Sequence, residues 1–398
     1  MAEIISHAYY SSSDIRHLAA TYRRGGLAAL QSEIESKANT FQNVKLDIAI
    51  MGASGVGKSS FINALRNLDV NDETAAPTGI VETTMECTRY LHPTLPNVTY
   101  WDFPGIGSAK LPVKKFLKVI DFSKFDFGII VCDERFNVED EILAKKMNKA
   151  NKPFYFVRTK IDLSIKAESK KTGYNQEQMF QKIRKYCSSS LANVGVKNTH
   201  VFLLSNEDVY NYDFPELNRA LDTVLPETKK NLFLFALPNT SIDVIERKQE
   251  LLKRFIHMVA TISACIGAVP IPTLSFACDL GLICLGLLFM QKILGLDDAS
   301  IQKLAHRVGK SEAYLRANIQ HPWVYGEISH EQVLTLLERS SIALALTAAE
   351  AILDFVPIIG SVFGATSSFW VTNTMLSDSL DEFVQAAKTV MQNAYNLV

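Results

Sequence analysis

The chain has 398 residues, of which 47% are hydrophobic, 10% aromatic and 21% charged. This length exceeds one compact core and the composition is that of folded proteins, so we expect about two or three domains and exclude a collagen-like or wholly disordered chain. The 41 basic and 42 acidic residues leave a net charge of -1, which provides no field to hold a polyanion. We therefore expect no nucleic-acid partner.

The six cysteines include no C-x-x-C pair, so the sequence predicts neither a zinc ribbon nor a disulfide framework. The opening residues, MAEIISHAYY, lack the basic segment followed by an apolar run that marks a secretory signal, and Ala2 replaces the glycine that myristoylation requires. We expect a protein that is not secreted and that resides in the reducing cytoplasm.

Residues 13–39 are rich in helix formers, and we expect an N-terminal helical segment over residues 1–42. An alternation of short apolar runs with helical stretches follows through residues 43–225 and predicts an α/β domain with a mostly parallel sheet. The expected strands are Lys45–Met51, Met85–His92, Val98–Phe103, Phe127–Cys132, Phe154–Thr159 and Val201–Leu204.

Residues 226–398 show helical periodicity without further strands, which predicts an all-helical C-terminal domain. Its apolar segments cover 258–291 and 341–376, and within them residues 258–278 and 355–376 carry no charge. Two interpretations remain open for these segments. They are core helices of the domain, or one hairpin inserts into or docks on a bilayer, although prolines interrupt both segments.

Residues 52–59 read GASGVGKS, the phosphate-loop pattern G-x-x-x-x-G-K-[ST], between an expected strand and an expected helix. Its glycines allow the backbone N–H groups to approach phosphate oxygens, Lys58 neutralises the β and γ phosphates, and Ser59 offers a hydroxyl to Mg²⁺. We expect the phosphates to contact Gly52, Gly55, Val56, Gly57, Lys58, Ser59 and Ser60.

Two later strand ends carry matching signals. Asp102 begins the sequence DFPG, where its carboxylate would hold Mg²⁺ and the N–H of Gly105 would meet the γ-phosphate. Residues 159–162 read TKID, and the Asp162 carboxylate would accept from both guanine N1–H and N2–H₂, while the Lys160 stem covers the base. Thr159 belongs to the same turn, and this pattern selects guanine over adenine.

Ser205 and Asn206 follow the last expected strand and would complete the base pocket. Between the phosphate loop and DFPG lie several threonines and Glu82, and one of those threonines must complete the Mg²⁺ shell and sense the γ-phosphate. Spacing alone does not choose among them. Ile106 follows Gly105 where Ras-like enzymes carry a water-orienting glutamine, which predicts slow hydrolysis by a monomer and acceleration when two nucleotide faces meet.

The segments MGASGVGKSSFINALR, WDFPGIGS, FYFVRTKID and GLDDASIQKLA resemble the immunity-related GTPases, an interferon-inducible family of cell-autonomous defence, in the subgroup with an intact phosphate-loop lysine. The resemblance covers most of the chain. It implies a P-loop GTPase domain plus an all-helical domain formed by the N-terminal and C-terminal segments, with GTP and GDP as substrate and product and Mg²⁺ as cofactor.

The resemblance also implies residue roles and partners. It matches Thr84 to the Mg²⁺-sensing threonine, and Thr78 and Glu82 to switch positions implicated in dimer-dependent hydrolysis. It implies self-association through the nucleotide face, association with related GTPases, and action on membranes of pathogen vacuoles through the C-terminal helical domain, either peripherally or by partial insertion.

Two other hypotheses compete with a GTPase that assembles on membranes. The missing glutamine is compatible with a nucleotide-binding scaffold or regulator that hydrolyses little GTP. The apolar C-terminal segments are compatible with a membrane-integrated protein whose nucleotide domain gates the helical part.

Overall fold

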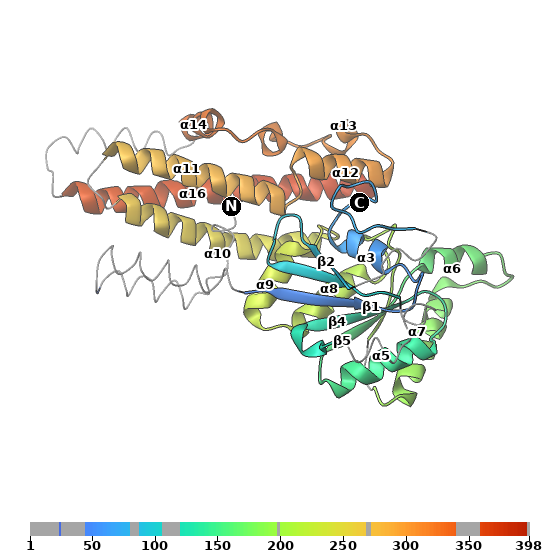
Figure 1. Cartoon of the computed structure of the whole chain (residues 1–398). Helices are drawn as coiled ribbons and strands as arrows, with labels where there is room; N and C mark the ends of the chain where they lie inside the picture. Colours follow the sequence, from blue (N-terminus) through green and yellow to red (C-terminus); the bar gives the residue numbers. More distant parts are fainter. Residues whose placement is uncertain are drawn as a thin grey trace. The chain divides into compact units, whose positions relative to one another are not determined.

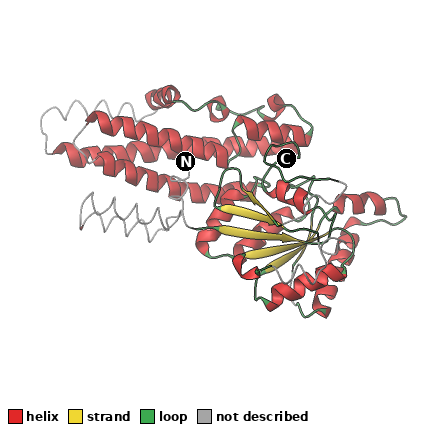
Figure 2. Ribbon diagram, viewed as in Figure 1, coloured by secondary structure: helices red, strands yellow, loops and turns green. Residues whose placement is uncertain are grey.

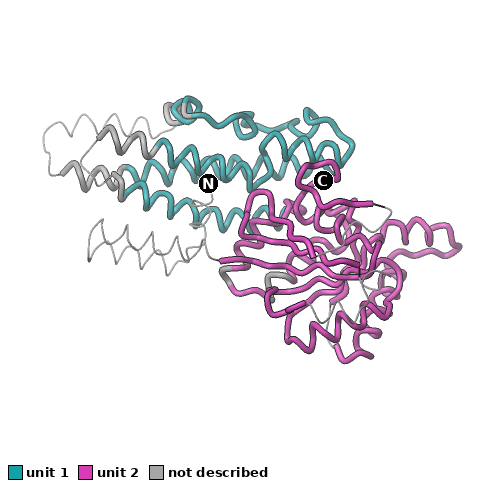
Figure 3. The backbone as a smooth tube through the Cα atoms, viewed as in Figure 1, with its two compact units in different colours: residues 1–43, 242–398 teal, residues 44–241 magenta. Residues whose placement is uncertain are grey.

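A computed structural model of the chain describes residues 24, 44–79, 87–105, 120–196, 200–267, 272–339 and 359–395. The expected N-terminal helical segment over residues 1–42 lies outside this range, apart from residue 24. The chain divides into two compact units, one built on residues 44–241 and the other containing the residues from Ile242 onward (Figure 3).

The first unit contains a six-stranded sheet in the order β2-β3-β1-β4-β5-β6, in which only β2 runs antiparallel to its neighbour (Figures 1 and 2). Each of the predicted strand segments contains one observed strand, so the predicted α/β class with a mostly parallel sheet is confirmed. The strands are β1 (Leu46–Met51), β2 (Thr88–Leu91), β3 (Val98–Asp102), β4 (Phe127–Cys132), β5 (Phe154–Arg158) and β6 (Val201–Leu203).

Helices cover both faces of this sheet, which explains why β4, with the sequence FGIIVC, is buried along its whole length. On one face, α5 and α7 pack over a core that includes Met51, Ile130 and Phe156. On the other face lie α3, α8 and α9, and the ring of Phe233 in α9 meets the ring of Phe127 in β4. The helical elements of this unit are α3 (Lys58–Leu65), η2 (Phe122–Lys124), α5 (Val138–Lys149), α6 (Ile161–Glu168), α7 (Gln176–Asn193), α8 (Phe214–Val224) and α9 (Glu227–Ala236).

The unit boundary falls after Ser241, whereas the sequence places it after residue 225. The intervening α9 packs on β1 and β3, and the Ala236 carbonyl oxygen lies 2.9 Å from His92 Nε2. Helical periodicity alone does not reveal that α9 covers the sheet. The sequence therefore assigns this segment to the helical domain.

Among its described residues, the second unit contains helices joined by turns and loops and no strand, as the sequence predicts. The long helices α10, α11 and α16 pack against one another (Figure 1). The uncharged stretch 258–278 belongs to two helices, because α10 ends at Gly267 and α11 begins at Pro272. The elements are α10 (Ile242–Gly267), α11 (Pro272–Ile293), α12 (Asp298–Val308), α13 (Glu312–Leu315), η3 (Pro322–Tyr325), α14 (His330–Arg339) and α16 (Ile359–Tyr395).

Polar side chains are buried between these helices and have hydrogen-bond partners. Ser263 Oγ on α10 lies 2.8 Å from Thr372 Oγ1 on α16. Lys248 on α10 is only 1% exposed, and its Nζ donates to the Ile293 carbonyl oxygen at 3.1 Å, at the end of α11. Burial lowers the pKa of Lys248 to about 7.

Among the described residues, one helical stretch, Leu280–Val308, has the length and composition needed to cross a membrane. Its most apolar window has a mean hydropathy of 1.7 and is 56% buried within the protein. Core helices of soluble proteins meet the same criteria.

Candidate functional site

The phosphate loop follows the carboxyl end of β1. In the sheet β1 lies between β3 and β4, so the strand order changes direction at this strand. Its glycines occupy backbone conformations that other residues rarely adopt, with φ of 153° at Gly52, 79° at Gly55 and 91° at Gly57. A Cβ on Gly52 would come within 2.1 Å of the Val131 carbonyl oxygen, so the loop lies directly against the end of β4. The loop geometry therefore requires glycine at these positions.

Lys58 is the first residue of α3 and is 6% exposed. Its Nζ donates to the carbonyl oxygen of Ala53 at 2.8 Å and so spans the loop from the helix back to its start. Because the unpaired N–H groups of a helix N-terminus lie beside it, this end of α3 has the positive field that favours a phosphate.

The hydroxyl and the carboxylate expected to hold Mg²⁺ are in contact. Ser59 Oγ donates to Asp102 Oδ2 at 2.6 Å, and Asp102 at the end of β3 is fully buried. Three residues later in DFPG, a Cβ on Gly105 would lie 2.5 Å from the Cα of Ser54, so that turn closes on the phosphate loop.

The Thr-Lys-x-Asp turn after β5 makes hydrogen bonds to the backbone of the phosphate loop. Thr159 Oγ1 donates to the Val56 carbonyl oxygen at 2.7 Å. Lys160 adopts a left-handed conformation with φ of 55°, and its Nζ donates to the Gly55 carbonyl oxygen at 2.8 Å. Asp162 follows in the first turn of α6 and is half-buried.

Ser205 and Asn206 follow β6 and complete the row of strand ends. Asn206 Nδ2 donates to the Gly57 carbonyl oxygen at 3.0 Å, so the last strand end also holds the phosphate loop. Ser205 Oγ and Asn206 Oδ1 are buried and have no hydrogen-bond partner among the described residues. Buried polar atoms normally have partners, and these atoms therefore fit a site for the polar edge of a ligand.

Asp133 is a residue of this site that the sequence reasoning missed. It directly follows β4, and its Oδ2 accepts from Lys160 Nζ at 2.9 Å. The available signal was its position: a charged residue directly after a buried parallel strand lies at the same edge as the other strand ends.

The switch residues lie mostly outside the described residues. Glu82 and Thr84 lie outside the described residues, whereas Thr78 is described and exposed. The chain leading to Thr78 is fixed to α3, because Asn63 Nδ2 donates to the Ala76 carbonyl oxygen at 2.9 Å and Ala76 N donates to Asn63 Oδ1 at 2.7 Å. The chain just before the switch segment is thus held against α3.

These contacts test whether the site suits a magnesium-bound nucleotide, and the residues fit. Adjacent hydroxyl and carboxylate oxygens are the ligand types that Mg²⁺ prefers, and the glycine loop and buried lysine suit a phosphate chain. The described residues contain no cluster of three or more His, Cys, Asp and Glu side chains that could hold a metal ion.

A mostly parallel sheet with a phosphate-type loop after its first strand, and a Thr-Lys-x-Asp turn bonded to that loop, places the first unit among the P-loop GTPases. The comparisons with known proteins narrow this class. The profile of the family described as Interferon-inducible GTPase (IIGP) matches residues 11–394. The chain belongs to this family, and it is a GTP hydrolase.

Several curated relatives are similar over most of their length. Interferon-inducible GTPase 5 of Rattus norvegicus is 35% identical over 382 residues, which cover 96% of this chain and 82% of the relative. Interferon-inducible GTPase 1 of Mus musculus is 36% identical over 319 residues, which cover 80% of this chain and 77% of the relative. The earlier resemblance to this family is thereby confirmed.

Proposed function

We propose that this chain hydrolyses GTP to GDP through the residues gathered at the strand ends, assembles with itself through the nucleotide face in the GTP state, and acts on intracellular membranes in innate defence. One observation supports this proposal most directly. Lys58 bonds across the phosphate loop and Ser59 bonds to Asp102, while Thr159 and Lys160 donate to carbonyl oxygens of the same loop.

In this proposal Lys58 Nζ exchanges the Ala53 carbonyl oxygen for phosphate oxygens, which is favourable because a charged acceptor makes a stronger hydrogen bond than a neutral one. Ser59 and Asp102 would hold Mg²⁺, which when bound neutralises charge that develops on the phosphate oxygens. Gly105, closed on the phosphate loop at Ser54, would direct its N–H toward the γ-phosphate.

Asp162 would accept hydrogen bonds from guanine, and Ser205 Oγ and Asn206 Oδ1 would gain the partners that the described residues do not supply. Thr84 would complete the Mg²⁺ shell, and Thr78 and Glu82 would contribute at the contact between two copies. The exposure of Thr78 supports that placement, because a contact residue must be reachable from outside.

Turnover of GTP at increasing protein concentration tests the assembly step. At saturating GTP, we expect the rate per molecule to rise with protein concentration, because the residue after Gly105 is Ile106 and a second copy must help to position water. Lys58→Ala serves as the inactive control. A rate per molecule that is independent of concentration would refute assembly-dependent hydrolysis.

Ile106 also supports a second candidate, a GTP-dependent scaffold with little hydrolysis. Phosphate release in single turnover separates the two candidates. Release within minutes supports a working enzyme, whereas GTP that remains intact on the assembled protein supports the scaffold.

The membrane part of the proposal rests on the apolar helices of the second unit and on the family's defence role. Alkaline carbonate extraction of cell membranes distinguishes the modes of contact. A peripheral protein is released, an inserted one remains, and a chain that never sediments with membranes contradicts this part of the proposal.

A further inference from the structure

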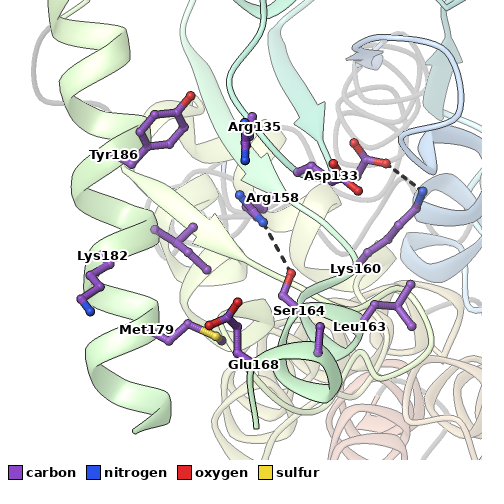
Figure 4. Close-up of a pocket in the computed structure, with 13 residues that line it drawn as sticks. Asp133, Arg135, Arg158, Lys160, Leu163, Ser164, Glu168, Met179, Lys182 and Tyr186 are labelled. Carbon is purple, nitrogen blue, oxygen red and sulfur yellow. Dashed lines mark hydrogen bonds and ion pairs between the residues drawn. The ribbon is translucent and has the colours of Figure 1, made fainter. Parts of the chain in front are cut away.

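A cavity of about 740 Å³ lies between α6, α7 and the turn after β4, beside the guanine-side loop (Figure 4). This volume falls within the range of small-molecule sites, roughly 300–1,000 Å³. Two of its lining residues belong to the nucleotide site: Lys160, whose Nζ donates to the phosphate loop, and Asp133, which pairs with that lysine. The remaining lining has no role in that function.

Arg158, the last residue of β5, points into this cavity between α6 and Arg135 (Figure 4). Its Nε is buried and has no hydrogen-bond partner among the described residues. Within the part of the chain that the structure describes, its Nη2 makes a single long contact, of 3.4 Å with Ser164 Oγ. A partly buried guanidinium with so few acceptors is costly unless an anion supplies them.

The acidic side chains that line the cavity do not supply acceptors to Arg158. Asp133 is paired with Lys160 at 2.9 Å, and Glu168 is paired with Lys171 at 2.5 Å. Arg135, Arg158 and Lys182 form no ion pair with any described residue, and they face only one further carboxylate, that of Glu134. The cavity therefore has an excess of positive charge near Arg158.

The walls beside this charge are apolar and partly open to solvent. Leu163 on α6 is 56% exposed and Tyr186 on α7 is 46% exposed. Met179 and Ile183 precede Tyr186 on the same face of α7 at helical spacing, and they line the same cavity. A ligand that covered these side chains would remove apolar surface from water.

We propose that this cavity binds an amphipathic organic anion, with its carboxylate at Arg158 and its apolar body between Leu163 on α6 and the Met179–Tyr186 face of α7. The planar guanidinium matches a carboxylate in shape as well as in charge, which distinguishes it from the flexible lysines nearby. Lys160 connects this site to the phosphate loop through its bond to the Gly55 carbonyl oxygen.

Calorimetric titration of the GDP-loaded full chain with decanoate tests the proposal. We expect saturable one-site binding with a Kd below about 1 mM. Decyltrimethylammonium carries the same apolar body with the opposite charge. It should bind at least about tenfold more weakly, because a cation cannot pair with Arg158.

Two variants test the location. Ala167 lines the cavity and is exposed, so Ala167→Trp should fill the cavity and weaken decanoate binding at least about tenfold. Arg158→Gln should do the same by removing the charge. Ala192→Trp is the matched control, because Ala192 is exposed on α7 outside the cavity, and it should bind decanoate normally.

Retained GDP affinity and an unchanged melting temperature show that a variant is folded. Arg158→Gln removes a charge and Ala167→Trp fills the cavity, so either variant alone tests the location of the site if it folds. The proposal is overturned by the absence of saturable decanoate binding to the unaltered chain. It is also overturned by equal binding of the cationic amphiphile, or by a folded variant that binds decanoate as well as Ala192→Trp does.

Discussion

Lys160 Nζ donates to the carbonyl oxygen of Gly55 at 2.8 Å, across 105 positions of the sequence. The lysine of the guanine-side turn therefore touches the phosphate loop itself, and Asp133 holds the same ammonium from the other side at 2.9 Å. This pair of contacts links the two halves of the proposed nucleotide site, so the shape of the phosphate loop depends on a residue of the base pocket.

The first prediction concerns this link. Lys160→Met keeps most of the side-chain length but removes the charge and both hydrogen bonds, so the loop should hold GDP less firmly and release it several-fold faster. Displacement of a fluorescent GDP analogue measures the release rate. Lys166→Met, at an exposed position on α6, is the control and should leave the rate unchanged.

Asp133→Asn refines this test. It removes the charged partner of Lys160 but leaves the bond to Gly55 available, so its effect on GDP release should be smaller than that of Lys160→Met. If Lys160→Met released GDP at the rate of the unaltered chain, the contact with Gly55 would have no part in nucleotide binding.

The second prediction concerns Lys58. Lys58→Ala should weaken GTP binding by at least about tenfold, because hydrogen bonds to charged groups contribute about 1.5–3 kcal/mol each. Equilibrium titration with labelled GTP measures the loss. Lys45→Ala changes an exposed lysine directly before β1 and should bind normally. Equal affinities in the two variants would exclude Lys58 from the phosphate site.

The third prediction concerns base selection. Asp162→Asn replaces one acceptor oxygen with a donor, which matches the acceptor that xanthine presents where guanine presents an amino group. Competition between GTP and xanthosine triphosphate should therefore shift toward the xanthine nucleotide. Asp121→Asn, at an exposed position in the same unit, should keep the guanine preference. Unchanged selectivity in Asp162→Asn would remove Asp162 from the base pocket.

The fourth prediction concerns Lys248 in the helical unit, whose pKa is lowered by burial to about 7. The usual pKa of a lysine side chain is 10.5, so between these values the unfolded chain binds more protons than the folded chain. The stability that depends on this lysine therefore rises as the pH increases from about 7 toward 10.5 and is lowest below pH 7.

Lys248→Met removes the titrating group while keeping an apolar side chain of similar length. The variant should be more stable than the unaltered chain at pH 6, and this advantage should shrink as the pH rises to 9, because neutral Lys248 keeps its bond to the Ile293 carbonyl oxygen. Urea unfolding of both proteins at each pH measures the difference. A difference that does not depend on pH would contradict the lowered pKa.

The amino-acid sequence by itself determined the strands of the sheet and the loops that follow them. Local patterns suffice for this, since a run such as FGIIVC has few structures open to it other than a strand covered on both faces. The phosphate loop could also be predicted from the sequence, because GASGVGKS carries its glycines and lysine in one short window between a strand and a helix.

Only the tertiary structure decided which distant residues share the site. Asp133 and Lys160 meet because β4 lies beside β5, and Asn206 reaches Gly57 because β6 ends at the same edge of the sheet. The assignment of α9 to the sheet unit and the division of residues 258–278 between α10 and α11 also depended on packing. Strand order and helix docking arise from contacts between segments far apart in the chain, and a pattern read within one short window carries no information about them.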